Sequence, residues 1–318
     1  MYRYILRRIL LMIPVLLSVA FIVFLIVNLT PGDIARTILG GEAPQSAVDQ
    51  LRHDMYLDQP IINRFFIYIR DILKGDFGIS YRSGTEVLPQ VAERFPVSLK
   101  LSLCAITFAI IAGVPLGILS AIKQYSILDN ICTVTGLFFA AVPPFWFGLM
   151  LIYFFSLQLG WLPTGGLSSV KSYVLPTLTV GIPAAAGLMR LTRSSMLETI
   201  RADYVRTARS KGLPERRVIV RHALKNALLP IITQIGMTFG IMFGNCAMSE
   251  TVYVIPGCGT LILNAVKSKD VPLTTGAILW LSMAFCCIML VVDLLYAFVD
   301  PRIKAKYKGT ARNFGGKV

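Results

Sequence analysis

Six apolar runs, each long enough or nearly long enough to cross a lipid bilayer, constrain this chain more than any other feature of its sequence. A membrane-spanning helix needs about 20 predominantly apolar residues. We expect spans over residues 9–29, 97–122, 131–159, 174–189, 228–254 and 272–299. The sequence therefore predicts an all-α integral membrane protein with six transmembrane helices.

Composition points to the same class. Of the 318 residues, 55% are hydrophobic and 15% are charged, whereas soluble domains carry about 25% charged residues. The net charge of +14 would suggest a nucleic-acid partner in a soluble chain. Here the cations cluster beside apolar runs, as the positive-inside rule expects. We therefore predict a lipid bilayer as the partner and no nucleic acid.

The N-terminus begins with a basic flank, Arg3, Arg7 and Arg8. A cleaved signal peptide would have an apolar core of about 7–15 residues, but this run continues through residues 18–20 without a polar break. We predict that residues 1–29 are a cytoplasmic N-terminus and an uncleaved first span. Six spans then place both termini in the cytoplasm, with residues 309–318 as a cytoplasmic tail.

Residues 30–96 form a polar segment whose acidic and basic side chains nearly balance. A low positive excess fits the outer side of the membrane, so we predict an extracytoplasmic insertion. Apolar periodicity indicates helices near residues 46–55 and 61–73, and the glycines of residues 75–81 break the pattern. The insertion is either a small cap packed on the spans or a rim that receives a substrate-delivery protein.

The polar stretch 204–230 lies between the fourth and fifth apolar runs. Gly212 stands where a helix would end, and Pro214 can open the next one. We predict a short helix, a sharp turn and a second helix on the cytoplasmic side. Its cations outnumber Glu215 and are Arg206, Arg209, Lys211, Arg216, Arg217, Arg221 and Lys225. Such a segment is typical of a docking surface and carries no catalytic pattern.

Thr207-Ala208, then Gly212 and Leu229-Pro230, resemble the cytoplasmic EAA loop of ABC importer permeases. The strings 190–198 and 203–212 resemble the peptide/nickel branch, the dipeptide- and oligopeptide-type B permeases. Arg206 stands where the general motif has glutamate, a departure that is usual in this branch. The resemblance implies the type I ABC importer permease fold, an external helical insertion between spans 1 and 2, and a five-span permease core over residues 97–308. It covers nearly the whole chain.

The resemblance also implies a function in the bacterial cytoplasmic (inner) membrane. The chain would form half of a translocation pathway with a homologous second permease, two ATP-binding-cassette ATPase subunits and an extracytoplasmic solute-binding protein. ATP and Mg would be bound by the ATPase subunits, with no cofactor in this chain. The expected cargo is dipeptides or oligopeptides, with nickel, glutathione or another small solute as alternatives. Within the coupling loop, residues 196–230, we expect contact with the ATPase from Thr207, Ala208, Lys211, Gly212, Leu213, Arg216 and Arg217.

Other function classes lack their signatures. The chain has no G-x-x-x-x-G-K-[ST] phosphate loop, no G-x-S-x-G, no H-E-x-x-H and no C-x-x-C pair. We therefore predict no catalytic and no metal site. Asp293 is the deepest ionisable residue we expect in a span, and a structural ion pair with Arg302 or a loop cation explains it better than a proton relay. A stand-alone secondary transporter or channel remains an alternative, as does a membrane enzyme or scaffold.

Four further features of the sequence lead to expectations. A break at residues 142–146 predicts a kink in the third span, either beside a pore or purely structural. Gly236, Gly240 and Gly244 form a small-x-x-x-small series that permits close helix contact. A short outer helix is expected over residues 259–266. The six cysteines are expected to act as small hydrophobic residues, with Cys258 on the outer side.

Overall fold

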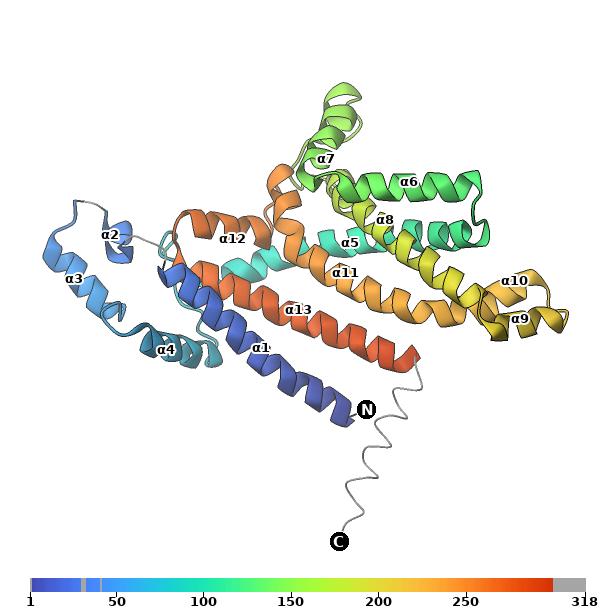
Figure 1. The fold of residues 1–318 in the computed structure, drawn as a ribbon. Coiled ribbons are helices and arrows are strands. Elements are labelled where there is room, and N and C mark those ends of the chain that lie inside the picture. The colour runs from blue at the N-terminus through green and yellow to red at the C-terminus, as the bar shows by residue number, and fades with distance from the viewer. Residues whose placement is uncertain (1, 30–32, 41, 300–318) are drawn as a thin grey trace, which may run out of the picture. The chain divides into compact units, whose positions relative to one another are not determined.

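The computed structural model describes residues 2–29, 33–40 and 42–299, and their elements are helices (Figure 1). The α-helices are α1 Tyr2–Leu29, α2 Ile34–Leu39, α3 Gln45–Asp54, α4 Ile61–Leu73, α5 Val87–Ile122, α6 Ile127–Ala141, α7 Pro144–Leu151, α8 Val174–Ile200, α9 Asp203–Ser210, α10 Glu215–Arg217, α11 Lys225–Val252, α12 Cys258–Lys267 and α13 Val271–Val299. Single π-helical segments follow α7 (Ile152–Gln158) and α10 (Val218–Leu224), and a 3₁₀ turn, Val170–Tyr173, precedes α8. The described residues fall into two compact units, one containing 8–98 with 256–286 and the other containing 99–255 with residues 2–7 and 287–299.

The predicted all-α membrane class with six spans is confirmed. Five long apolar helical runs qualify as spans, and α6 with the α7 segment forms a sixth that is bent by 105°. The bend follows from the sequence, because a residue before proline is pushed to extended backbone. Val142 has φ −72° and ψ 128°, and Pro144 then restarts the helix at its first turn. The third run is therefore two helices meeting at a sharp corner, where we had predicted one kinked span.

Several helices are longer than the apolar runs suggested. α5 begins at Val87, before the predicted start at residue 97, because Val87 and Val91 are fully buried against neighbouring apolar side chains. α8 continues past residue 189 to Ile200. The fifth run is continuous with α10 and extends from Glu215 to Val252. Polar residues extend these helices because one face of each remains buried.

In the unit that contains residues 99–255, α8 packs against α6, α7 and α11 (Figure 1). Glycines allow close backbone approach: a Cβ at Gly113 of α5 would lie 2.5 Å from the Ala185 carbonyl oxygen of α8. Of the predicted glycine series, Gly236 contacts Val292 of α13, whereas Gly244 faces open space. The close contact expected of the series is therefore confirmed at Gly236 and absent at Gly244.

The unit that contains residues 8–98 and 256–286 holds the two helices predicted in the insertion, which are confirmed as α3 and α4. Phe65 of α4 packs edge-on against Phe24 of α1, with ring centroids 5.7 Å apart. The predicted short helix near residues 259–266 is confirmed as α12. Cys258 is fully buried, and its N–H donates to the Ser98 hydroxyl at 2.8 Å.

The ionisable residues that are buried in the structure are not the ones that the sequence led us to expect. Glu250 of α11 is fully buried and Asp129 of α6 is 2% exposed, whereas Asp293 is only half-buried. Asp293 is therefore not the most buried ionisable group in the predicted spans, and its proposed partner Arg302 lies outside the described residues. Helical periodicity could not separate these positions, because burial depends on which helices pack against each face.

Candidate functional site

The coupling loop forms a helical hairpin in which α9 leads through Gly212 to α10. α9 is amphipathic, with Val205 and Ala208 buried and the remaining side chains outward. The buried residues pack against Met196 at the end of α8 and against Val218 and Ile219, which follow α10. This apolar cluster fixes the hairpin to the membrane-spanning helices. A movement of the hairpin surface would therefore be transmitted to α8 and α11.

Gly212 makes the turn. Its φ is +74°, in the left-handed region that glycine adopts without the steric cost of a Cβ. Its N–H donates to the Arg209 carbonyl oxygen at 2.9 Å, which closes the end of α9. Pro214 is extended, with ψ 140°, and α10 begins directly after it. The predicted helix, turn and second helix are all present at the expected residues.

An ion pair that sequence reasoning missed spans this turn. Arg209 donates through Nη2 to Glu215 Oε1 at 2.7 Å and through Nε to Glu215 Oε2 at 3.1 Å. These hydrogen bonds raise the pKa of the Arg209 guanidinium above its ordinary value. The pair holds the end of α9 against the start of α10. The opposite charges on either side of the glycine turn are the feature of the sequence that could have predicted this ion pair.

The predicted coupling residues divide into two groups. Those on the surface are Thr207, Lys211, Gly212, Arg216 and Arg217. Ala208 is buried, and Leu213 is partly buried against the same apolar cluster. The second group therefore packs the hairpin against the apolar cluster.

The exposed face of the hairpin carries unbalanced positive charge. Among the described residues, ion pairs on this segment involve only Arg206 with Asp203, at 3.7 Å, and Arg209 with Glu215. The cations without such a pair there are Lys211, Arg216, Arg217, Arg221 and Lys225. A surface of this kind favours a partner with acidic side chains.

A buried ion pair supports the helices that lead to the hairpin. Arg193 of α8 donates through Nε and Nη2 to the two carboxylate oxygens of Asp129 in α6, at 2.6 and 2.8 Å. The Ser120 hydroxyl of α5 donates to the same carboxylate at 2.5 Å. Three helices are thus joined through one carboxylate. Over the part of the chain that the structure describes, no cluster of side chains has the composition of a metal site.

Family comparison covers nearly the whole chain. Residues 113–305 match the family described as "Binding-protein-dependent transport system inner membrane component", and residues 1–102 match its N-terminal family. The chain is 39% identical over 306 residues to the "Glutathione transport system permease protein GsiC" of Escherichia coli K12, covering 96% of this chain and 100% of that protein. The protein of the same name in Pectobacterium atrosepticum is 40% identical over 309 residues, with the same coverage of both chains.

Solved structures show the same fold at low sequence identity. An inward-facing structure of the MetNI methionine ABC transporter aligns with a TM-score of 0.57 and 17% identity, covering 67% of this chain and 97% of that one. An amino acid ABC transporter crystallised with histidines aligns with a TM-score of 0.52 and 15% identity, over 68% and 94% of the two chains. Together with the hairpin and the six spans, these matches establish that the chain belongs to the binding-protein-dependent inner-membrane components, as an ABC importer permease of the peptide/nickel-type branch.

Proposed function

We propose that this permease forms half of a translocation pathway for short peptides and that its coupling loop binds an ATPase subunit. The family implies ATPase and binding-protein partners. The further assignments are that two ATPase subunits and a homologous second permease complete the machine, and that hydrolysis takes place in the ATPases. ATP and Mg would then bind outside this chain.

The observation that carries the coupling assignment is the hairpin of α9 and α10. Its outer face is cationic and exposed, while Ala208 and Leu213 anchor it to the ends of the long helices. Because this surface is rigid and attached to membrane-spanning helices, it can transmit the closing movement of an ATPase to those helices. An exposed basic loop that only fixed topology would need neither the apolar anchor nor the Arg209–Glu215 pair.

The names of the relatives support the cargo assignment. Two relatives of nearly full coverage are described as glutathione permeases, and glutathione is a tripeptide with free carboxylates. Dipeptides, oligopeptides and glutathione all belong to one chemical class, short peptides with charged ends. We therefore assign this class as the cargo. A binding protein on the outer side would deliver them, with the insertion of residues 30–96 facing it and both termini in the cytoplasm.

Reconstitution tests the proposal. Liposomes holding this chain alone, and liposomes holding it with its partner permease, ATPases and binding protein, would be compared for uptake of radiolabelled dialanine and glutathione. We expect ATP-dependent uptake only in the complete set, with no ATPase activity from the lone chain. Uptake by the lone chain under a proton gradient would instead support a secondary transporter. Failure of both peptides in an otherwise active complete set would reject the cargo class.

A further inference from the structure

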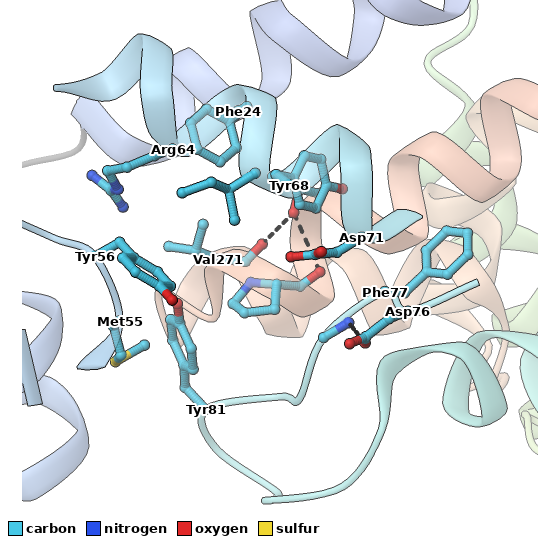
Figure 2. A pocket seen from close by; sticks show the side chains of 14 residues that line it. Phe24, Met55, Tyr56, Arg64, Tyr68, Asp71, Asp76, Phe77, Tyr81 and Val271 are labelled. Carbon is cyan, nitrogen blue, oxygen red and sulfur yellow. Dashed lines mark hydrogen bonds between the residues drawn. The ribbon is translucent and has the colours of Figure 1, made fainter. Parts of the chain in front are cut away.

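A cavity of about 220 Å³ lies within the unit that contains residues 8–98 and 256–286 (Figure 2). Its wall comes from α1, the residues after α3, α4, the loop over residues 76–81 and the start of α13. Most of the lining is aromatic or apolar. The charged side chains among the lining residues are Arg64, Asp71 and Asp76. The coupling loop does not contribute to it.

One face of α4 forms much of the wall. Arg64, Ile67, Tyr68 and Asp71 follow the i, i+3, i+4, i+7 spacing that places side chains on a single helix face. With a rise of 1.5 Å per residue, the Cα atoms of Arg64 and Asp71 are separated by about 10 Å along the axis. In Figure 2 Arg64 lies at one side of the cavity, and Tyr68, Asp71 and Asp76 lie toward the other. The cavity thus has a cationic end and an anionic end.

At the cationic end Arg64 is half-buried. Its Nη2 donates to Asn28 Oδ1 at 2.5 Å, and its guanidinium carbon lies 5.9 Å from the centre of the Phe24 ring. Burial lowers the pKa of Arg64 because the charge loses hydration. Arg64 forms none of the ion pairs found among the described residues, and a guanidinium has five N–H donors. A half-buried cation in this state favours an anionic ligand.

At the anionic end two carboxylates retain free accepting capacity. Asp71 accepts one hydrogen bond from Arg70 Nε at 2.9 Å, and Asp76 accepts one from the Gly78 N–H at 2.8 Å. An ionised carboxylate has about four acceptor positions. Both groups can therefore accept further hydrogen bonds from an ammonium group.

Tyr68 and Tyr81 also line the cavity. Burial raises the pKa of Tyr68 and of Tyr81 to about 12, so both remain neutral donors at physiological pH. Within the described part of the chain, the buried Tyr68 hydroxyl makes no well-aligned hydrogen bond, and the neighbouring Thr275 hydroxyl donates instead to the Val271 carbonyl oxygen at 2.8 Å. Buried polar groups are nearly always satisfied, and a ligand amide would satisfy this one.

We propose that this cavity binds a short peptide with free termini, its carboxylate at Arg64 and its ammonium group at Asp71 and Asp76. The inference rests on the proposed function, since it assigns a second site to the same cargo class. An extended chain advances about 3.3–3.6 Å per residue, so a peptide of two or three residues is comparable in length with the separation of about 10 Å between the Cα atoms of Arg64 and Asp71 along α4. The aromatic rings of Tyr56, Phe77 and Tyr81 would contact the side chains of the peptide.

A binding experiment on the complete permease–ATPase complex, without its binding protein, tests this site. Scintillation proximity would measure equilibrium binding of radiolabelled dialanine, its C-terminal amide and its N-acetyl derivative. In the wild type we expect each modification to weaken binding about tenfold or more, because each removes one charge-assisted contact. Arg64→Gln should weaken the free peptide similarly and make amidation harmless. Asp71→Asn should reduce the effect of acetylation in the same way.

Two control variants accompany this binding experiment. Arg82→Gln and Asp54→Asn change exposed side chains of the same unit and should bind as the wild type does. Assembly of each variant with its partner subunits would be checked by size-exclusion chromatography. The site is overturned if the wild type shows no saturable binding, or if amidation weakens binding equally in Arg64→Gln and in the wild type. ATP-driven uptake by the wild-type set with its binding protein tests the proposed function separately. If uptake occurs but the binding differences described above are absent, the peptide site is rejected and the proposed function is not.

Discussion

At the scale of single residues, Asp129 is a buried carboxylate whose charge is compensated by a few specific contacts. It accepts from Arg193 at 2.6 and 2.8 Å and from Ser120, and its side chain is 3% exposed. Asp129→Ala leaves the Arg193 guanidinium without its counter-ion, and breaking a buried pair costs about 3–5 kcal/mol. We expect a large fall in the unfolding temperature of the purified permease complex in detergent.

The matched control for that change is Asp203→Ala. Asp203 lies at the start of α9, its side chain is 97% exposed, and Arg206 is 3.7 Å away. Exposed pairs of this geometry contribute little to stability, so its unfolding temperature should match the wild type. An equal loss in both variants would show that the burial of Asp129 has no special energetic role.

Gly212 supports a second prediction at this scale. A Cβ there meets nothing within 4 Å, so any effect of substitution arises from the backbone at φ +74°. Gly212→Val should cost about 1–2 kcal/mol in the turn and should uncouple transport from ATP hydrolysis while insertion stays normal. Gly212→Asn, which tolerates the left-handed region better, should restore part of the coupling. Normal ATP-driven uptake by Gly212→Val would contradict the coupling assignment.

At the scale of helices, α5 and α8 approach through glycine. A Cβ at Gly113 would lie 2.5 Å from the Ala185 carbonyl oxygen, so Gly113→Ala must push the two helices apart. Overpacking of this kind costs about 1–3 kcal/mol. Gly187→Ala in α8 is the control, because nothing lies within 4 Å of its added Cβ. We expect the unfolding temperature to fall for Gly113→Ala and to stay the same or rise for Gly187→Ala.

Helices were predictable where their own residues decide the structure. The insertion helices α3 and α4, the short helix α12 and the turn at Gly212 follow from periodicity and from glycine or proline placement. The start of α5 at Val87 does not, because it depends on burial of Val87 and Val91 by residues far along the chain. The pairing of Asp129 with Arg193 and the burial of Glu250 likewise require neighbours that no local pattern specifies.

Only part of the candidate site was predictable from the sequence. The surface residues of the coupling loop follow from the cation excess, from Gly212 and from the resemblance at Thr207-Ala208, and they lie on one exposed hairpin. The anchoring of Ala208 and Leu213 depends on Met196 and Val218, which reach them only through tertiary packing. The cavity lined by α4 was missed because its charged residues come together with loop residues and with α13.

At the scale of the whole molecule, the topology of the insertion is open to direct measurement. In a variant without its six native cysteines, single cysteines replacing Asp49 and Arg82 should react with an impermeant thiol reagent applied outside intact cells. The expectation rests on the balanced charge of residues 30–96 after a basic N-terminal flank. A cysteine replacing Lys211 should react only after the cells are opened. The reverse pattern of labelling would invert the topology.

The unbroken run from Glu215 to Val252 has a mechanical consequence. Its 38 residues correspond to a rod about 57 Å long at 1.5 Å per residue. If one end is held, a rotation of about 5° displaces the other end by about 5 Å over that length. The run therefore acts as a lever, and a small displacement of α10 can become a movement on the scale of a side chain at the far end. Its π-helical turn, Val218–Leu224, lies close to the driven end, so a bend there would act over nearly the whole remaining length and would strongly change the movement delivered to Val252.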